Sequence, residues 1–254
     1  MKMSAALTIR VVTSLEEFKG LAREWEELLD RVPGHSLFLT WEWLYYWATH
    51  HLEDGQLRIL LASDEHECLV GIAPLYLRRT KAQGLISVRE LRWLGSEAVC
   101  SSYLDFIVQE RHKPALLQRL YRYLFNEARG EWDMLTLSDV PAESSTLDLW
   151  NELFAEAGKV GEVVRMTSCP VVRLPRDVGS YRAGLGRNRR YTLQRKTKCL
   201  AEAGRVHFTR ATNPADVEAA FESVVALHPV SYTHLRAHET VLDLVCRLLL
   251  EKKK

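Results

Sequence analysis

The chain has 254 residues, of which 47% are hydrophobic and 26% charged, and its 34 Lys+Arg and 33 Asp+Glu leave a formal net charge of +1. This near-neutral balance argues against a chain that wraps nucleic acid over its whole surface. No stretch approaches the ~20 apolar residues that span a bilayer, and the N-terminus lacks the apolar core of a secretory signal. We therefore expect a cytoplasmic protein without a membrane span.

The first part of the chain alternates between strand and helix patterns. Residues 7–13 alternate as a strand, and Ser14 with Glu17 forms the capping box of a first helix. A second helix is expected over 40–52. Further strands are expected at 57–63, 68–76, 88–94, 103–108, 132–137, 161–166 and 169–174, and further helices at 114–128 and 144–157. This alternation predicts an α/β fold, and the hairpin around the polar turn at 64–67 makes its sheet mixed.

After Pro175 the pattern starts again. A basic helical stretch over 180–203 is followed by an alternating strand pattern at 205–211 and by a helix that Asn213 caps. Asn213 repeats the role of Ser14, which suggests a second domain of the same design. We predict a first domain at 1–175 and the beginning of a second at 176–229.

The last residues, 230–254, resemble a translated sequencing adapter that runs into a poly-A read. We therefore expect a natural chain of 1–229 that has lost its C-terminal part; the alternative is an ordinary amphipathic C-terminal helix. A set with the spacing of metal ligands, namely His228, His234, His238 and Cys246, lies mostly in this segment, so we predict no metal site.

The helix over 40–52 has aromatic residues on every side, Trp41 and Trp43 among them. Part of the set must be buried, and core packing is one interpretation. The other is a groove wall that stacks against a sugar or an acyl acceptor.

The segment at 101–108 places Tyr103 and Asp105 on one face of the predicted strand. Aspartate is disfavoured inside strands, so Asp105 needs a reason to be there. It holds an acceptor amine, it orients Tyr103, or it is satisfied by a neighbouring Arg or a turn amide.

The segment at 181–190 combines glycine and arginine as a phosphate cradle does. Tyr181 stands where the pyrophosphate loop of GNAT acetyltransferases has Gln or Arg, and no strand leads into the motif, so we assign no phosphate site. The basic stretch at 182–210 is a solvated surface, a contact with a missing part, or a polyanion site.

Several segments in succession resemble the CelD/BcsL-type acyltransferases of the GNAT superfamily, which are built like FemAB enzymes from two GNAT-like halves. The matching pieces lie at 36–38 with 41–47, at 69–75, at 94–95 with 102–105, and at 132–135 with 139–141. The basic helix and the helix ending at His228 continue the match over nearly all of 10–229. The resemblance implies a GNAT-like mixed sheet flanked by helices, followed by the start of a second GNAT-like half.

The family further implies N- or O-acyl transfer from acyl-CoA, such as acetyl-CoA, to a small-molecule, glycan or peptide acceptor in cell-envelope or exopolysaccharide pathways, including cellulose biosynthesis. The CoA site belongs to the C-terminal half beyond residue 229, so we expect this fragment to bind no acyl-CoA and to be inactive. The N-terminal half shapes the acceptor side, and we expect contacts from Tyr103, Asp105, Trp41 and Trp43. Catalytic residues and the oligomeric state stay unassigned.

Two alternatives belong to other classes of protein. One is a non-catalytic module that binds a glycan or a precursor through the aromatic helix at 40–52. The other is a nucleic-acid-binding fragment that uses residues 182–210, which the near-neutral charge and the missing recognition motif disfavour.

Overall fold

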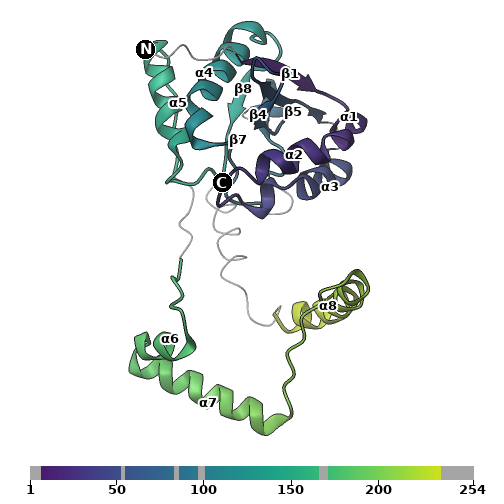
Figure 1. Ribbon diagram of the computed structural model, residues 1–254, viewed down its shortest axis with the longest axis vertical. Helices are drawn as coiled ribbons and strands as arrows, with labels where there is room; N and C mark the ends of the chain where they lie inside the picture. The colour runs from purple at the N-terminus through teal and green to yellow at the C-terminus, as the bar shows by residue number, and fades with distance from the viewer. Residues whose placement is uncertain (1–6, 53–54, 83–85, 97–100, 166–170, 236–254) are drawn as a thin grey trace. The chain divides into compact units, whose positions relative to one another are not determined.

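The computed structural model describes residues 7–52, 55–82, 86–96, 101–165 and 171–235. The chain divides into two units, Met1–Ser168 and Cys169–Lys254. Within the described residues, every strand belongs to the first unit, and the second consists of helices and irregular chain (Figure 1). The predicted domain boundary at 175/176 stays a prediction.

The first unit is built on two four-stranded sheets. One has the order β1-β3-β4-β7 and is antiparallel, and the other has the order β2-β5-β6-β8, in which β6 and β8 run parallel. The strands are β1 (Thr8–Val12), β2 (Gln56–Leu57), β3 (Ile59–Ser63), β4 (Leu69–Ala73), β5 (Leu75–Ala82), β6 (Ile86–Trp93), β7 (Ile107–Val108) and β8 (Met134–Thr136). The predicted α/β class with a mixed sheet is confirmed, and so is the predicted hairpin.

One hairpin is shared by the two sheets. Gln56 lies opposite Leu77 in one sheet and Leu61 opposite Ile72 in the other, with the same register on both sides of Pro74. Proline has no N–H to give to a ladder, so the strand pair is interrupted there without losing its register. Both strands of the hairpin therefore run on from one sheet into the other.

Strands β6 and β7 pair one after the other with the second strand of this hairpin: β6 pairs with β5, and β7 pairs with β4. At the end of β6 the Leu94 N–H donates to the Pro74 carbonyl at 2.8 Å, and Ile107 of β7 lies opposite Ile72. On the shared strand, Pro74 is bonded to Leu94 and Ile72 is paired with Ile107, so only Ala73 stands between the two ladders. Of the residues between Leu94 and Ile107, those that the structure describes, 95–96 and 101–106, lie outside the ladder.

The strand predicted over 103–108 is wrong for its first part, because only Ile107–Val108 is a strand. Tyr103 has a φ of +57°, a left-handed conformation that no strand accommodates. The Asp105 carboxylate accepts the Phe106 N–H at 2.7 Å, as in a turn.

The N-terminal helices lie on one side of the strands (Figure 1). They are α1 (Leu15–Gly20), α2 (Ala22–Leu29), the short helix η1 (Leu37–Leu39) and α3 (Trp41–His51). The predicted N-cap is confirmed, because Ser14 Oγ accepts the Glu17 N–H at 3.2 Å. Phe18 and Trp25 are completely buried, and Trp25 Nε1 donates to the Leu39 carbonyl at 2.9 Å.

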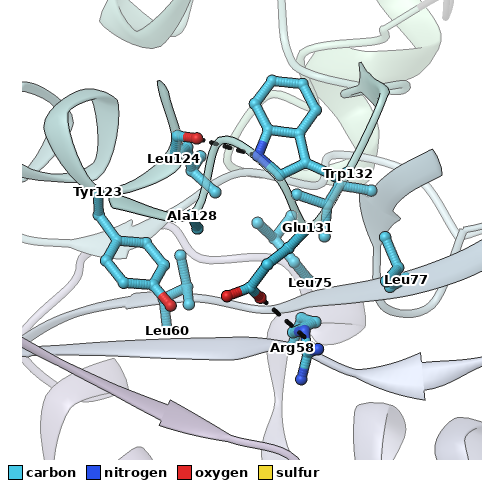
Figure 2. Close-up of a pocket in the computed structure, with 10 residues that line it drawn as sticks. Arg58, Leu60, Leu75, Leu77, Tyr123, Leu124, Ala128, Glu131 and Trp132 are labelled. Atoms are coloured by element: carbon cyan, nitrogen blue, oxygen red, sulfur yellow. Dashed lines mark hydrogen bonds and ion pairs between the residues drawn. The ribbon is translucent and has the colours of Figure 1, made fainter. Parts of the chain in front are cut away.

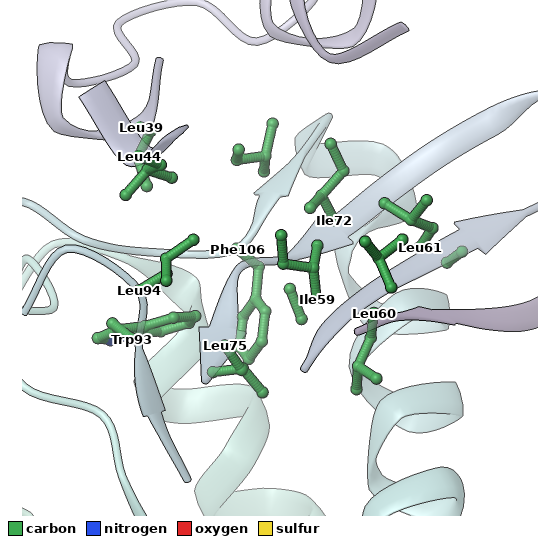
Figure 3. Packing of buried hydrophobic residues seen from close by; sticks show 14 of the residues in the cluster. Leu39, Leu44, Ile59, Leu60, Leu61, Ile72, Leu75, Trp93, Leu94 and Phe106 are labelled. Carbon is green, nitrogen blue, oxygen red and sulfur yellow. The ribbon is translucent and has the colours of Figure 1, made fainter. Parts of the chain in front are cut away.

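The opposite side is covered by η2 (Glu110–His112), α4 (Lys113–Arg122), the π-helical turn η3 (Tyr123–Glu127) and α5 (Ser145–Glu156). Helix α4 packs directly on β4: a Cβ on Gly71 would lie 2.7 Å from the Leu116 side chain. Figure 3 shows Phe106 beside Trp93 in the core, and their rings meet edge to face at 4.8 Å. The core thus draws on both ends of the segment that leaves the ladder.

The second unit contains α6 (Val178–Gly184), α7 (Arg187–Ala203) and α8 (Pro214–Leu235). The predicted basic helix is present in two pieces, which extended backbone at Leu185 separates. The predicted cap is confirmed, because Asn213 Oδ1 accepts the Asp216 N–H at 2.9 Å. The strand predicted at 205–211 is wrong: these residues are irregular, and Phe208 is 95% exposed.

The strands predicted at 161–166 and 169–174 are also wrong where the structure describes them. Residues 161–165 and 171–174 are irregular and exposed, and 166–170 lie outside the described residues. Their alternating valines have the pattern of a strand, but a strand forms only when another one supplies its hydrogen bonds.

Candidate functional site

Three loops of the first unit line a pocket of about 650 Å³. They are residues 32–36 after α2, residues of 103–108, and residues of 141–144 before α5; Glu110 and Lys113 also line it. A pocket of this size is suited to a small-molecule ligand.

The Asp105 carboxylate joins two of these loops, its own and the one before α5. Its Oδ2 accepts the hydroxyl of Ser144 at 2.5 Å and the ammonium of Lys113 at 3.3 Å. Its Oδ1 accepts the hydroxyl of Thr146 at 2.7 Å. The Asp105 and Lys113 side chains are only 14% and 8% exposed, and buried charges are tolerated when they are paired and hydrogen-bonded. Because Ser144 caps α5, Asp105 fastens its own segment to the start of that helix.

A second carboxylate shares the ammonium of Lys113. Glu110 Oε2 lies 3.3 Å from Lys113 Nζ, and Ser145 Oγ donates to Glu110 Oε1. The Ser145 hydroxyl chiefly holds the pKa of Glu110 below its ordinary value, with help from the charge of Lys113 and against partial burial. The base of the site therefore carries an ion-pair network with Glu110 as its exposed member.

Tyr103 reaches the pocket from a strained backbone. Its side chain is 45% exposed, and its left-handed φ of +57° is unusual for an aromatic residue. The next N–H, that of Leu104, donates to the carbonyl of Asp139 at 3.1 Å, and Asp139 has a φ of +59°. Two loops with uncommon backbone conformations thus meet at the pocket.

The loop that carries Tyr103 is fixed at two further points. Trp43 Nε1 donates to the Ser101 hydroxyl at 3.0 Å, and Ser36 Oγ donates to the Ser102 carbonyl at 3.2 Å. At the start of the same segment Gly95 has a φ of +89°, and a side chain there would meet Leu44. Helix α3 therefore supports the segment.

The two predicted tryptophans lie outside the pocket lining. Trp41 Nε1 donates to the Phe18 carbonyl at 3.0 Å, and its ring stacks on Tyr45 at 4.6 Å. The Trp43 ring packs edge to face on Phe38 at 5.0 Å. Both indoles are half-buried and take part in packing, which favours the core interpretation of this helix.

The structure thus brings Tyr103 and Asp105 together at the pocket and leaves Trp41 and Trp43 outside its lining. The sequence alone does not reveal the Asp105 partners Lys113, Ser144 and Thr146. Ser144 was recognisable at the start of a predicted helix, but nothing in the sequence connects it with residue 105.

A smaller cavity, of about 10 Å³, lies between the sheet and η3 (Figure 2). Arg58 pairs across it with Glu131 at 3.6 Å, and Trp132 Nε1 donates to the Leu124 carbonyl at 3.0 Å. Burial raises the pKa of Tyr123 beside it. The space is enough for about one water, so it is a packing gap.

A buried carboxylate outside the pocket, Glu90, joins three strands. It accepts Arg78 Nε at 3.1 Å and the hydroxyl of Thr136 at 2.7 Å, and Arg92 lies 3.8 Å away. These contacts tie β5, β6 and β8 together, which is a structural role.

Among the described residues, no group of three or more His, Cys, Asp and Glu side chains is placed to hold a metal ion. The set of His228, His234, His238 and Cys246 lies outside the described side chains. No helix in the described part of the chain combines the length and apolar character that crossing a bilayer requires.

No protein-family model matches the chain, and no curated protein is significantly similar to it. Among solved structures, the chain is similar to a tetramutant of the BH1408 protein from Bacillus halodurans, with 13% identity, 65% of this chain and 99% of that chain covered, and a TM-score of 0.38. For glucosamine-6-phosphate N-acetyltransferase from Arabidopsis thaliana the identity is 14%, the coverage is 65% of this chain and 98% of that chain, and the TM-score is 0.36. For an aminoglycoside 6'-N-acetyltransferase from Acinetobacter baumannii the identity is 12%, the coverage is 66% of this chain and 99% of that chain, and the TM-score is 0.35. At such low identities and TM-scores, these likenesses decide nothing about the activity of this chain.

Proposed function

We propose that the first unit is the acceptor-side domain of an acyl-CoA-dependent N- or O-acyltransferase of the CelD/BcsL type within the GNAT superfamily, with a cell-envelope or exopolysaccharide-related acceptor and a place in the cytoplasm. The succession of sequence segments over 10–229 and the mixed α/β architecture support the family. The observation that carries the acceptor role is the pocket of about 650 Å³ beside Tyr103 and the buried Asp105–Lys113 pair.

The contacts of Asp105 favour one of its three predicted roles. Its two oxygens accept four protein donors, from Lys113, Ser144, Thr146 and Phe106. A carboxylate so occupied has little capacity left for an acceptor amine. In the proposed site Asp105 therefore positions the loop of Tyr103, and Tyr103 contacts the acceptor.

The described residues of the second unit do not fit an acyl-CoA site. A GNAT-type donor site requires a strand whose backbone amide polarises the thioester and a helix N-terminus for the pyrophosphate. The second unit contains no strand among its described residues, and its helices are exposed. We assign none of these residues to the donor and derive no transfer step.

Binding and turnover together test this function. The purified chain is titrated with amino sugars, disaccharides and amino-acid amides, and CoA release from acetyl-CoA is followed with each. We expect saturable binding of at least one acceptor, weakened by Tyr103→Ala, without CoA release above the buffer blank. Transfer of acetyl groups by the chain would show that a donor site is present, and the absence of any acceptor binding would refute the proposed pocket.

The alternative glycan- or precursor-binding module built on the aromatic helix gains no support from the structure. The indole N–H groups of Trp41 and Trp43 both donate to the protein itself. A double variant, Trp41→Ala with Trp43→Ala, should accordingly lose stability, which thermal unfolding will show.

A further inference from the structure

The segment that leaves the sheet at Leu94 supplies a wall of the pocket. Leu94 and Ile107 flank the segment at the two ladders: the Leu94 N–H donates to the Pro74 carbonyl, and Ile107 lies opposite Ile72. The side chains of Leu94 and Ile107 are buried in the core. The described residues between them, 95–96 and 101–106, take no part in either ladder.

The backbone of the described part of this segment has a left-handed conformation at Tyr103. Three residues other than glycine have a left-handed φ among those described, namely Glu67, Tyr103 and Asp139. Glu67 lies in the hairpin turn, where its N–H donates to Asp64, and aspartate tolerates this conformation better than most residues. An aromatic residue does not, so Tyr103 is the outlier of the three.

The surroundings hold Tyr103 in this conformation from both directions. Ser101 and Ser102 are tethered to α3 and to the loop before it, while Leu104 and Asp105 are tethered to Asp139 and to the start of α5. Strain persists only where the structure around it over-determines the conformation, and it gathers at ligand-binding positions. The result is a tyrosine ring that stands half-exposed at the pocket between two buried core positions.

We infer that residues 101–105 are a selectivity segment and that Tyr103 is its specificity-determining residue, which stacks on a sugar ring of the acceptor. The inference rests on the proposed function. An aromatic ring suits the C–H face of a pyranose through its apolar surface. The carboxylates of Glu110 and Glu143 line the same pocket and accept hydroxyl or ammonium hydrogens of such a ring.

A matched pair of glycine substitutions separates strain from recognition. Tyr103→Gly and Asp139→Gly each relieve a left-handed φ, so both should raise the Tm of the full chain by a few degrees. Only Tyr103→Gly removes the ring. Binding of glucosamine, of cellobiose and of lysine amide to each variant is followed by ligand-observed NMR, with Tyr103→Phe as the variant that keeps the ring.

We expect glucosamine or cellobiose to bind the chain, and Tyr103→Gly to weaken that binding about tenfold, equivalent to about 1.4 kcal/mol. Asp139→Gly and Tyr103→Phe should stay close to the unmodified chain. Equal binding by Tyr103→Gly, or equal weakening by Asp139→Gly, would overturn the inference. Binding of lysine amide alone would overturn the sugar assignment and leave the acceptor pocket standing, whereas binding of none of the three probes contradicts the inference and the proposed pocket alike.

Discussion

The opening of the chain and residues 205–227 carry one local pattern with two outcomes. Ser14 and Asn213 each cap a helix, with a side-chain oxygen 3.2 Å and 2.9 Å from a backbone N–H. Before the first cap, Thr8–Val12 pairs with β3 as a strand. Before the second cap, residues 205–211 are irregular.

The apolar residues that follow the two caps differ in the same way. Phe18 in α1 is completely buried, whereas Phe221 in α8 is 67% exposed. A cap needs only its own neighbours in sequence, and so it forms in both places. A strand and a buried face need distant partners, which are present around β1 and absent around 205–211 in the described structure.

We expect the largest difference between the two regions when each of these two phenylalanines is replaced by alanine. Phe18→Ala should lower the free energy of unfolding by about 3–5 kcal/mol, because it leaves a cavity in the core. Phe221→Ala should change it by less than about 0.5 kcal/mol. Urea denaturation of both variants measures the difference, and similar losses would mean that Phe221 is packed in solution.

A second contrast compares a buried ion pair with an exposed one. Asp105→Ala leaves the ammonium of Lys113 buried and should cost about 3–5 kcal/mol of unfolding free energy. Glu202→Ala removes the partner of Lys198 on α7, where both side chains are exposed, and should cost at most about 1 kcal/mol. Adding Lys113→Met to Asp105→Ala should restore part of the lost unfolding free energy. Urea titration measures the single and the double variant. Coinciding unfolding curves would argue against the buried pair.

Removing the two helix caps, by contrast, should have a similar effect on helix stability in both regions. Ser14→Ala and Asn213→Ala each remove one helix-capping hydrogen bond and should cost about 0.5–2 kcal/mol of helix stability. Hydrogen exchange of the first turns of α1 and α8 follows each helix separately. Faster exchange in only one of the two would show that the cap also depends on tertiary packing.

The smallest effect concerns two exposed carboxylates with lowered pKa values. The side chain and N–H of Arg89 lower the pKa of Asp133 to about 2, and the hydroxyl and N–H of Ser180 lower the pKa of Asp177. Because the folded-state values lie below the ordinary one, each contributes stability above the ordinary pKa that is lost as the pH falls. For Asp133 that loss extends down to about pH 2.

Carboxyl NMR titration checks both values. Arg89→Met should return the pKa of Asp133 toward its ordinary range, and so should urea, because this contact joins distant parts of the chain. Ser180→Ala should act on Asp177 alone. If urea left the pKa of Asp133 low, the Arg89 contact would not be its cause.

Features with a local cause were predictable from the sequence. The hairpin at 57–76 follows from two apolar runs around a polar turn, and the caps at Ser14 and Asn213 follow from residue type and spacing. The strands at 205–211 and over 171–174 were over-predicted, because alternation shows only that a segment suits a sheet.

The pocket was predictable only in part. Tyr103 and Asp105 were recognisable because an aspartate in an apolar run is unusual. The partners of Asp105, namely Lys113, Ser144 and Thr146, stand 8, 39 and 41 residues along the chain, and only the tertiary fold brings them to it. The left-handed backbone of Tyr103 also arises from tethers outside its own sequence neighbourhood.

The register around Leu94 has an evolutionary consequence. Because the chain leaves one ladder at Leu94 and joins the other at Ile107, a change in length between these residues does not alter the register of either ladder. Within Leu75–Ala82, by contrast, which pairs with β6 in an unbroken register, a single added residue would turn the following side chains of the strand to the opposite face. We therefore expect homologous genes to vary in length between Leu94 and Ile107 and to keep the length of Leu75–Ala82 constant. New acceptors can then be acquired without refolding the sheet.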